Sequence, residues 1–402
     1  MALVQFATKL NPTAKLLIRN FSAASSKTVN SVKDKNVKKS VFISQSTNVY
    51  TNLALEDWLY RNFNLNNHHI LMLWRNDPCV VIGRHQNPWV ETNTSELTHI
   101  TDSGVQVARR SSSGGANYHD QGNLNLTFFT PVHEYNHKHN LEVITRALFR
   151  EYGIKLEISS DEDLLIRNAK VSGTAAKLGH VNAYHHCTLS VNVDKVDHSH
   201  SLQQTDTGIK SNAPKTKRSK ILNLCEENPK INFAGVLRAI GWEYMRTPVN
   251  SFKDGGTALA NKQNGFQMIN PTEQWFPGIS KLQEKFSDWE WCYGETPKFT
   301  VTKSFPVPHE FLNGYNGING NLSITMVVEH GRINDVLLHI PPGLSTTGFT
   351  GKANVITSLK NQKFTEDVIN FVESSLCGNE YGYVDDKDKF ITECVRRVMT
   401  SV

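Results

Sequence analysis

Two adjacent arginines, Arg109 and Arg110, stand before a run of serine and glycine that includes Gly114 and Gly115. Because small residues let a backbone come close to a ligand, amide N–H groups and guanidinium donors can face the oxygens of an anion. The segment therefore predicts a cradle for a phosphate or a carboxylate. Its glycine spacing matches neither the P-loop nor the dinucleotide-binding fingerprint. A flexible loop with solvated arginines is the alternative that these residues alone leave open.

A second segment places Lys170 shortly before a run of small residues at 172–176. A lysine ammonium is a compact charge with three hydrogen-bond donors, so it can contact carbonyl and phosphate oxygens. Such a contact stabilises the negative charge that develops during acyl transfer. By itself, a lysine is more often a solvated surface charge.

Two neighbouring histidines, His185 and His186, lie in a segment of strand character. Adjacent strand residues point to opposite faces of a sheet, which disfavours a shared metal ion and favours structural or hydrogen-bonding roles. Cys187 follows them without a motif for an activated thiol, so packing is a better interpretation than nucleophilic catalysis. The six cysteines form no Cys-x-x-Cys pair. We predict no metal site and no disulfide framework.

The elements that must position these residues are typical of a mixed sheet with helices. Apolar residues recur at helical spacing over 49–61, after a capping region at 46–48. Apolar runs at 70–74 and 79–82 are separated by Asn-Asp-Pro, a turn sequence. Further strands are predicted to end at Arg109 and to cover 124–128, 163–167, 170–173 and 185–193.

The remaining part of the chain contains a long polar segment and a second set of elements. Residues 195–219 are rich in Ser, Thr, Asp and Lys, and we interpret them as a mobile loop. Alternating apolar residues over 322–328 and 334–340 predict a hairpin, and helical spacing returns over 368–376. Glycine and proline at 294–297 indicate a domain boundary, with a small domain after it.

The composition fits a soluble protein of 402 residues, with 39% hydrophobic and 20% charged residues. No apolar run approaches the roughly 20 residues that span a bilayer, so no membrane partner is predicted. Residues 1–40 hold eight basic side chains and one acid, so the net charge of +5 becomes −2 over the rest of the chain. A nearly neutral body is a poor general binder of polyphosphate, and no nucleic-acid partner is predicted.

The basic start of the chain has the character of a mitochondrial presequence. No acid precedes Asp34, lysines and arginines are spaced, and Ser, Ala and Thr are frequent. Arg19 stands two positions before Phe21, an arrangement that resembles a matrix-peptidase site. We predict a mitochondrial transit peptide over 1–26 and a location in the mitochondrial matrix. A disordered basic tail is the alternative.

Several motifs together resemble those of the lipoate-protein ligase family, in particular its animal mitochondrial lipoyltransferase branch. The resemblance covers most of residues 45–300, and any one motif would be weak evidence, whereas several in the family's order are specific. The motifs are Asn-x-Ala-x-Glu at 52–56, Gly-Arg-His-Gln-Asn-Pro-Trp at 83–89, Tyr-His-Asp at 118–120, Gly-Asn-Leu-Asn at 122–125, Lys-Val-Ser-Gly-Thr-Ala at 170–175 and His-His-x-Thr-Leu at 185–189.

The resemblance implies an α+β fold: a mixed-sheet catalytic domain of the biotin/lipoate ligase type with flanking helices over 41–290, and a small α+β accessory domain over 291–402. It implies a lipoyltransferase, an acyltransferase that modifies proteins by lipoylation. The donor would be lipoyl-AMP, or a lipoylated glycine-cleavage H protein. The acceptor would be the ε-amine of a lysine on the lipoyl domains of 2-oxoacid dehydrogenase acyltransferase subunits.

The resemblance also implies a set of site residues. Lys170 would be catalytic, through contacts with the carbonyl and phosphate oxygens of the acyl-adenylate. No covalent enzyme intermediate is required, because the adenylate is already activated. The residues expected to bind lipoyl-AMP are Arg110, Gly114, Gly115, Ala116, Asn117, Tyr118, Asp163, Lys170 and Thr188.

Two alternatives stay open. A complete lipoate-protein ligase would use ATP and Mg²⁺, but Asp161 stands where many relatives have a basic residue, and an acid there opposes phosphate. Ser113 and Asn117 also depart from the family's loop. The second alternative is a non-catalytic assembly factor that binds lipoylated proteins. Basic residues that could compensate for Asp161, or form a solvated charge run, are Lys210, Lys215, Lys217, Arg218 and Lys220.

Overall fold

The computed structural model describes residues 37–402 except 94–96, 98–103, 203–206, 250, 313–319, 345–349, 355–358, 366–367, 369–385 and 401–402. Lys38–Val402 forms one compact unit, distinct from Met1–Val37. The predicted transit peptide and most of the helix predicted over 368–376 lie outside the described residues. Both stay predictions.

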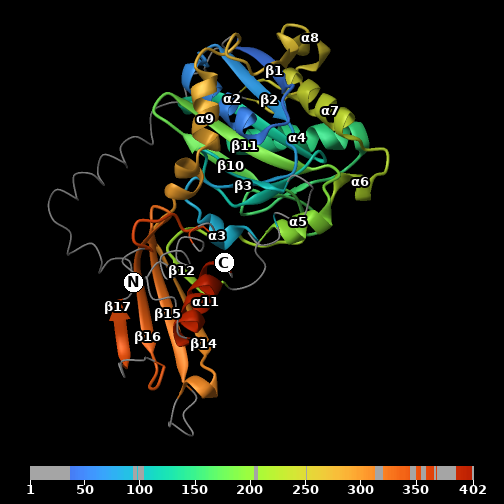
Figure 1. The fold of residues 1–402 in the computed structure, drawn as a ribbon. Coiled ribbons are helices and arrows are strands. Elements are labelled where there is room, and N and C mark those ends of the chain that lie inside the picture. Colours follow the sequence, from blue (N-terminus) through green and yellow to red (C-terminus); the bar gives the residue numbers. More distant parts are fainter. Residues whose placement is uncertain are drawn as a thin grey trace, which may run out of the picture. The chain divides into compact units, whose positions relative to one another are not determined.

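A six-stranded mixed sheet has the order β10-β11-β6-β2-β1-β13 (Figure 1). Its strands are β1 (Lys38–Ser44), β2 (His68–Trp74), β6 (Asn123–Pro131), β10 (Thr174–Leu178), β11 (Asn182–Ser190) and β13 (Gly265–Ile269). β1 pairs in parallel with β2 and β13, whereas the other pairs are antiparallel. The α+β class with a mixed sheet, predicted from the sequence, is confirmed.

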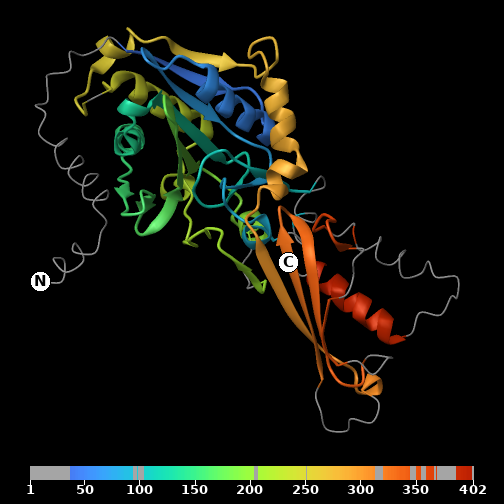
Figure 2. The ribbon, with the colours of Figure 1, turned by 90° about the vertical axis from the view of Figure 1, so that its left-hand side faces the viewer.

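Helices cover both faces of this sheet (Figure 2). α2 (Val49–Asn62) and α9 (Ile279–Ser287) contribute to one hydrophobic cluster, and α4 (His137–Tyr152) and α7 (Phe233–Arg246) contribute to another. β6 explains the separation, because Phe128 belongs to the α4 and α7 cluster whereas its neighbour Phe129 belongs to the α2 cluster. The predicted cap of α2 is confirmed, since the side chain of Asn48 accepts a hydrogen bond from the backbone of Thr51 at 3.0 Å.

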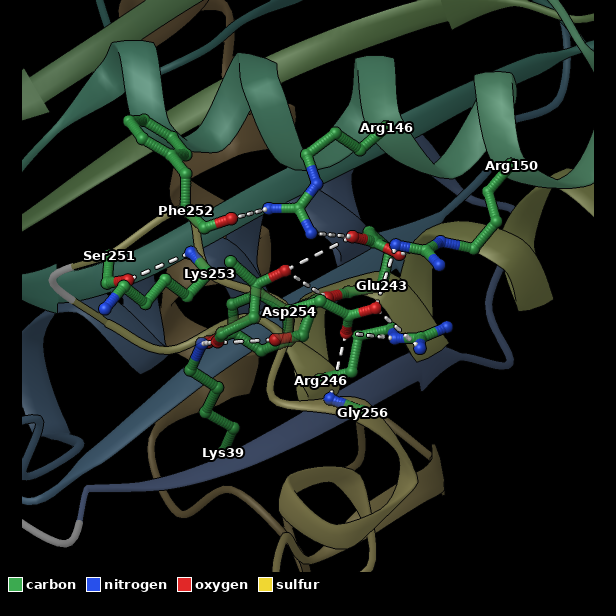
Figure 3. A network of polar contacts seen from close by, with 12 residues as sticks. Lys39, Arg146, Arg150, Glu243, Arg246, Ser251, Phe252, Lys253, Asp254 and Gly256 are labelled. Carbon is green, nitrogen blue, oxygen red and sulfur yellow. Dashed lines mark hydrogen bonds and ion pairs between the residues drawn. The ribbon is translucent and has the colours of Figure 1, made fainter.

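Arginines and carboxylates join α4 to α7 (Figure 3). The carboxylate of Glu243, which is buried on α7, receives Arg146 at 3.0 Å and Arg150 at 3.1 Å from α4. Arg150 also contacts Asp254, which Arg246 of α7 contacts at 2.8 Å. Two guanidinium groups thus compensate the buried charge of Glu243, and the two helices are fixed against each other.

Two three-stranded sheets carry the segments with candidate chemistry. In the first, β3 (Cys79–Ile82) lies between β4 (Gln106–Arg109) and β5 (Asn117–His119), so the arginine and glycine loop leaves one neighbour of β3 and returns on the other. In the second, β8 (Leu164–Ile166) lies between β7 (Glu157–Ile158) and β9 (Ala169–Ser172). The strands predicted around Arg109 and Lys170 are confirmed.

A five-stranded sheet contains most of the C-terminal elements, in the order β12-β14-β15-β16-β17. Its strands are β12 (Ile209–Ser211), β14 (Phe299–Pro306), β15 (Asn321–Glu329), β16 (Arg332–Ile340) and β17 (Gly351–Asn354). The predicted hairpin is confirmed, because β15 and β16 are antiparallel neighbours. α11 (Asp386–Thr400) packs into the same hydrophobic cluster through Val395 and Val398. The proposed division between residues 290 and 291 stays a prediction.

The segment 195–219 is not the continuous loop that its polar composition predicted. α5 (Lys195–Ser201) begins it, because the side chain of Asp194 accepts hydrogen bonds from the backbone of Val196 and Asp197. β12 then pairs with β14, a strand far away in the sequence. Composition was a poor guide here because a cap and a long-range strand partner determine the local structure.

The remaining helical elements are short. No helix in the described part of the chain has the length and apolar character that a membrane span needs. The short elements are α3 (Pro88–Glu91), α6 (Leu224–Glu227), α8 (Gly256–Ala260), and the turns η2 (Val132–Glu134), η3 (Glu290–Gly294) and η4 (His309–Phe311).

Candidate active site

A pocket lies where the arginine and glycine loop meets β9, β10 and β11. Its lining comes from the loop at 115–117 with Arg110, from the run 170–175, and from alternate residues of β11 at positions 186, 188 and 190. Its volume is about 80 Å³. Pockets that bury a drug-sized ligand have volumes of about 300 Å³ or more, so a nucleotide-sized ligand either extends beyond this pocket or displaces part of its wall.

Lys170 lines the pocket from β9. Its ammonium lies 2.8 Å from the carboxylate of Asp163, and both side chains are about a quarter or less exposed. The backbone of Lys170 donates to Lys220 O at 2.8 Å and accepts from Leu222 N at 2.9 Å. The ammonium is therefore held in one place, because both its backbone and its charged end are fixed.

Arg110 is a buried residue that shapes the loop. Its Nη2 donates to Ser113 O at 2.9 Å and to Gly115 O at 2.8 Å, and its Nη1 donates to Val81 O at 3.2 Å. Burial lowers the pKa of Arg110 to about 10, which leaves it charged at neutral pH. Since two of these bonds go to loop carbonyls, Arg110 stabilises the loop and supplies positive charge beneath it.

Arg109, the other arginine of the pair, points away from this pocket and joins two distant segments. Its Nη1 donates to Gln86 O at 2.7 Å, and its Nη2 donates to Cys292 O at 2.7 Å and to Thr296 Oγ1 at 2.9 Å. The sequence suggested one pair of anion-binding arginines. The structure assigns Arg109 to holding 86 and 292–296 together.

The loop packs closely on the turn after β3. Gly114 has φ +102, a conformation that favours glycine. A side-chain carbon on Gly83 would lie 2.1 Å from Gly114 O, so these two backbones meet where only hydrogen atoms fit. Gly83 therefore sets the position of the arginine and glycine loop.

A segment from far along the chain crosses the loop. Thr216 lines the pocket, and its hydroxyl oxygen accepts hydrogen bonds from Ala116 N at 2.7 Å and from Gln86 Nε2 at 3.0 Å. Ile221 also contributes to the lining. Thr216 was not among the predicted site residues, because nothing in a polar run identifies the one hydroxyl that contacts a loop 100 residues earlier.

Another wall of the pocket is formed where β10 meets β11. The hydroxyl of Thr188 accepts from Gly173 N at 3.2 Å, and Thr188 N donates to Gly173 O at 2.9 Å. These bonds fix the turn between β9 and β10, so Thr188 places both its own hydroxyl and the residues next to Lys170.

Two histidines line the pocket, and neither was predicted to. His186 Nδ1 lies 3.0 Å from the carboxylate of Glu56, which also accepts from Thr127 Oγ1 at 2.7 Å. His119 contacts Asn76 Nδ2 at 3.1 Å, and burial holds the pKa of His119 well below its usual range. His119 is thus neutral, and Glu56 fixes the orientation of the His186 ring.

His185 and Cys187 lie on the other side of β11 from His186, as the strand alternation predicted. Their side chains are buried toward α4, where Asn140 Nδ2 lies 3.4 Å from His185 Nδ1. Burial raises the pKa of the Cys187 thiol far above its usual range, so the group is protonated. Among the described residues, no group of three or more potential metal ligands is present.

The structure brings together most of the predicted site residues but not all. Three of them, Gly114, Tyr118 and Asp163, do not line the pocket: Gly114 shapes the loop, Tyr118 is buried in a separate hydrophobic cluster, and Asp163 lies behind Lys170. The predicted residues that line the pocket are Arg110, Gly115, Ala116, Asn117, Lys170 and Thr188.

A loop of small residues and a fixed lysine around one pocket form an arrangement that can bind an anionic acyl compound, as acyl-transferring enzymes require. A scan against family models matches residues 48–243 to the lipoyl protein ligase A/B catalytic domain. Lipoyl amidotransferase LIPT1, mitochondrial, of Mus musculus is 40% identical over 74% of this chain and 75% of its own length. The human protein of that name is 41% identical over 69% of this chain and 71% of its length.

A bacterial relative, the lipoate-protein ligase A of Bdellovibrio bacteriovorus, is 34% identical over 75% of this chain and 83% of its length. The chain therefore belongs to the lipoyl protein ligase A/B family. It is an acyltransferase-type enzyme, and the lipoyl transfer that the sequence predicted is confirmed as its function.

Solved structures agree on the fold. LipL1 of P. falciparum, solved in complex with lipoate, matches with a TM-score of 0.52 at 24% identity and covers 90% of this chain and 100% of its own. The bipartite lipoate-protein ligase of Thermoplasma acidophilum matches with a TM-score of 0.50 at 19% identity, over 64% of this chain and 96% of its own. The predicted biotin/lipoate ligase type of fold is thus confirmed.

Proposed function

We propose that this chain takes a lipoyl group from lipoyl-AMP and attaches it to the ε-amine of a lysine on a lipoyl domain. The observation that carries this proposal is the pocket that Lys170 lines together with Gly115, Ala116 and Asn117 of the loop. Amide N–H groups and an ammonium together are the donors that a phosphate and an acyl carbonyl need.

The proposed roles follow from the contacts. Lys170, held by Asp163, contacts the acyl carbonyl oxygen and the bridging phosphate, where charge builds up. The acceptor amine attacks the carbonyl carbon, the C–O bond to phosphate breaks, and AMP leaves with the electron pair while the amine loses a proton. Positioning and charge stabilisation are sufficient for this step, so no enzyme nucleophile is needed. The thiol of Cys187 lies on the other face of β11.

We further propose where the reaction takes place and with which partners. The mammalian relatives are named mitochondrial, and the basic leader at 1–26 supports import into the matrix. The proposed acceptors are lipoyl domains of the acyltransferase subunits of 2-oxoacid dehydrogenases. A lipoylated glycine-cleavage H protein is the alternative donor.

A complete lipoate-protein ligase is the second candidate, and relatives named lipoate-protein ligase A favour it. It would need Mg-ATP. The two carboxylates before β8 are already engaged, since Asp163 holds Lys170 and Asp161 pairs with Lys217 at 2.9 Å. The Asp161 charge is compensated, but neither carboxylate is available to Mg²⁺ without breaking an ion pair. These contacts favour transfer without activation.

The test is lipoylation of a purified lipoyl domain, followed as intact mass. One reaction contains lipoyl-AMP, another lipoate with Mg-ATP, and a third a lipoylated H protein. Product with lipoyl-AMP alone supports the transferase, and product with lipoate and Mg-ATP supports the ligase. If Lys170→Ala gives wild-type yields with every donor, the proposed site is wrong and the assembly factor becomes the better explanation.

A further inference from the structure

The segment 214–221 has two kinds of attachment to the pocket. Near its end, the backbone bonds between Lys170 and residues 220 and 222 tie it to β9. In its middle, Thr216 contacts the loop through its hydroxyl. The side chains of Lys215, Lys217, Arg218 and Lys220 are exposed, so most of the segment has little hydrophobic contact to hold it. The attachment at Thr216 therefore decides where the middle lies.

Glu91 supplies the firm partner at that point. Its side chain is only 2% exposed, and its Oε1 accepts a hydrogen bond from Thr216 N at 3.1 Å. It lies within electrostatic reach of Arg110 and Arg218, which compensate for burying a carboxylate. Glu91 itself does not line the pocket. Glu91 is thus a buried carboxylate that bonds to a segment 125 residues away, and this bond holds the segment in place.

The helix that carries Glu91 is well anchored. α3 is capped by Asn87, whose side chain accepts from Trp89 N at 3.0 Å, and Trp89 packs with ring centroids 5.3 Å from Phe299. A further contact of the segment, between Lys217 and Asp161, joins side chains that are 82% and 59% exposed, and such pairs contribute little. Pro214 O also accepts a hydrogen bond from Gln86 Nε2, at 3.4 Å. Glu91 is thus the fixed side of the contact, and the segment is the movable side.

We propose that Glu91 is a positioning residue that holds segment 214–218 across the Gly115–Ala116 backbone. Thr216, the residue of this segment that lines the pocket, thereby keeps its place against the loop, where its hydroxyl accepts from Ala116 N. A donor in this pocket meets that wall, so the place of the segment affects donor binding. The effect of Glu91 on donor binding rests on the proposed function, whereas its effect on the position of the segment does not.

The structural consequence is tested by limited trypsin digestion without donor. Trypsin cuts after exposed lysine and arginine, and mass spectrometry quantifies cuts at 215, 217, 218 and 220. Glu91→Ala should speed these cuts about tenfold, because it removes a charged hydrogen bond. Glu91→Gln keeps an oxygen acceptor but loses the charge, so its rate should lie between those of the wild-type protein and Glu91→Ala. Glu151→Ala, an exposed carboxylate on α4, is the matched control.

Unchanged cutting in Glu91→Ala would overturn the proposal, and so would equal acceleration in Glu91→Gln and Glu91→Ala. Thermal unfolding monitors the fold of each variant. If Glu91→Ala does not fold, Glu91→Asp replaces it, since it keeps the charge but shortens the side chain, and the same faster cutting is expected.

The kinetic consequence is a higher KM for lipoyl-AMP, by about tenfold in Glu91→Ala, with kcat changed by less than about threefold. Rescue by Glu91→Gln is expected. A fall in kcat with an unchanged KM would overturn the positioning role. If the wild-type protein transfers no lipoyl group at all, the proposed function fails, whereas the trypsin result still decides whether Glu91 holds the segment.

Discussion

The ammonium of Lys170 lies 2.8 Å from the carboxylate of Asp163, and only Lys170 of the two lines the pocket. Asp163 comes directly before β8 and Lys170 lies on the neighbouring strand β9, so one small sheet builds both halves of the pair. On the proposed function, Lys170 contacts the substrate, and Asp163 acts on the reaction by holding Lys170 in place.

Replacement of these two residues should have graded effects on lipoyl transfer. Lys170→Ala is expected to lower kcat/KM by about 100- to 1000-fold, the usual loss when a donor to a developing negative charge is removed. Asp163→Asn keeps a hydrogen-bond acceptor and should cost about fivefold, because a partly exposed ion pair contributes about 1 kcal/mol. Single-turnover transfer from lipoyl-AMP measures both. A larger loss in Asp163→Asn than in Lys170→Ala would contradict these roles.

Gly83→Ala should damage donor binding while the protein stays folded. The new methyl group would lie 2.1 Å from Gly114 O, so the arginine and glycine loop has to shift. We expect the KM for lipoyl-AMP to rise about tenfold or more, in line with the effect of misplacing reacting groups by an ångström. Gly153→Ala is the control: it also strains a glycine, with φ +71 and nothing within 4 Å, but at the end of α4. It should lower stability without changing this KM.

The sequence identified the loop at 110–118 and Lys170 because glycine spacing and motif order are local properties. It could not separate Arg109 from Arg110, because their difference depends on tertiary contacts: Arg109 bonds to Cys292 O and Arg110 to Gly115 O. Thr216 and Glu91 were missed for a related reason. Their contact joins a polar run to a buried helix, and no composition or period marks such a pair.

The same limit applies to the fold. Strands with continuous apolar runs were predictable, as in β2 of the six-stranded sheet and β3 of a three-stranded sheet, whereas β1 and β13 were not predicted. β12 was not, because Ile209–Ser211 becomes a strand only through its pairing with β14. Tertiary contacts decide the structure where the local pattern is weak.

Stability should depend on pH through Lys39, a buried residue at the start of β1 (Figure 3). Its ammonium donates to Tyr244 O and Thr247 O, and burial lowers its pKa from 10.5 to about 7. Between these values the unfolded chain binds the proton and the folded chain releases it, so this group makes the protein more stable as pH rises from 7 toward 10.5.

The measurement is urea unfolding of the wild-type protein and Lys39→Met at several pH values. The free energy of unfolding of the wild-type protein should rise relative to that of Lys39→Met, by up to about 1.4 kcal/mol per pH unit above pH 7. Parallel curves would mean that Lys39 keeps its proton in the folded state.

Substitutions of Trp89 test whether its contacts with Phe299 and Phe364 anchor α3. Its ring is 6% exposed and lies 5.3 Å from Phe299 and 5.4 Å from Phe364, measured between centroids. Trp89→Ala should lower the free energy of unfolding by about 3–5 kcal/mol, as for other large core truncations, and Trp89→Phe by less. Urea denaturation measures both. Because α3 also carries Glu91, Trp89→Phe should speed trypsin cutting at 215–220 even where the protein stays folded. A lower free energy of unfolding without faster trypsin cutting would mean that Glu91 holds its segment independently of the cluster around Trp89.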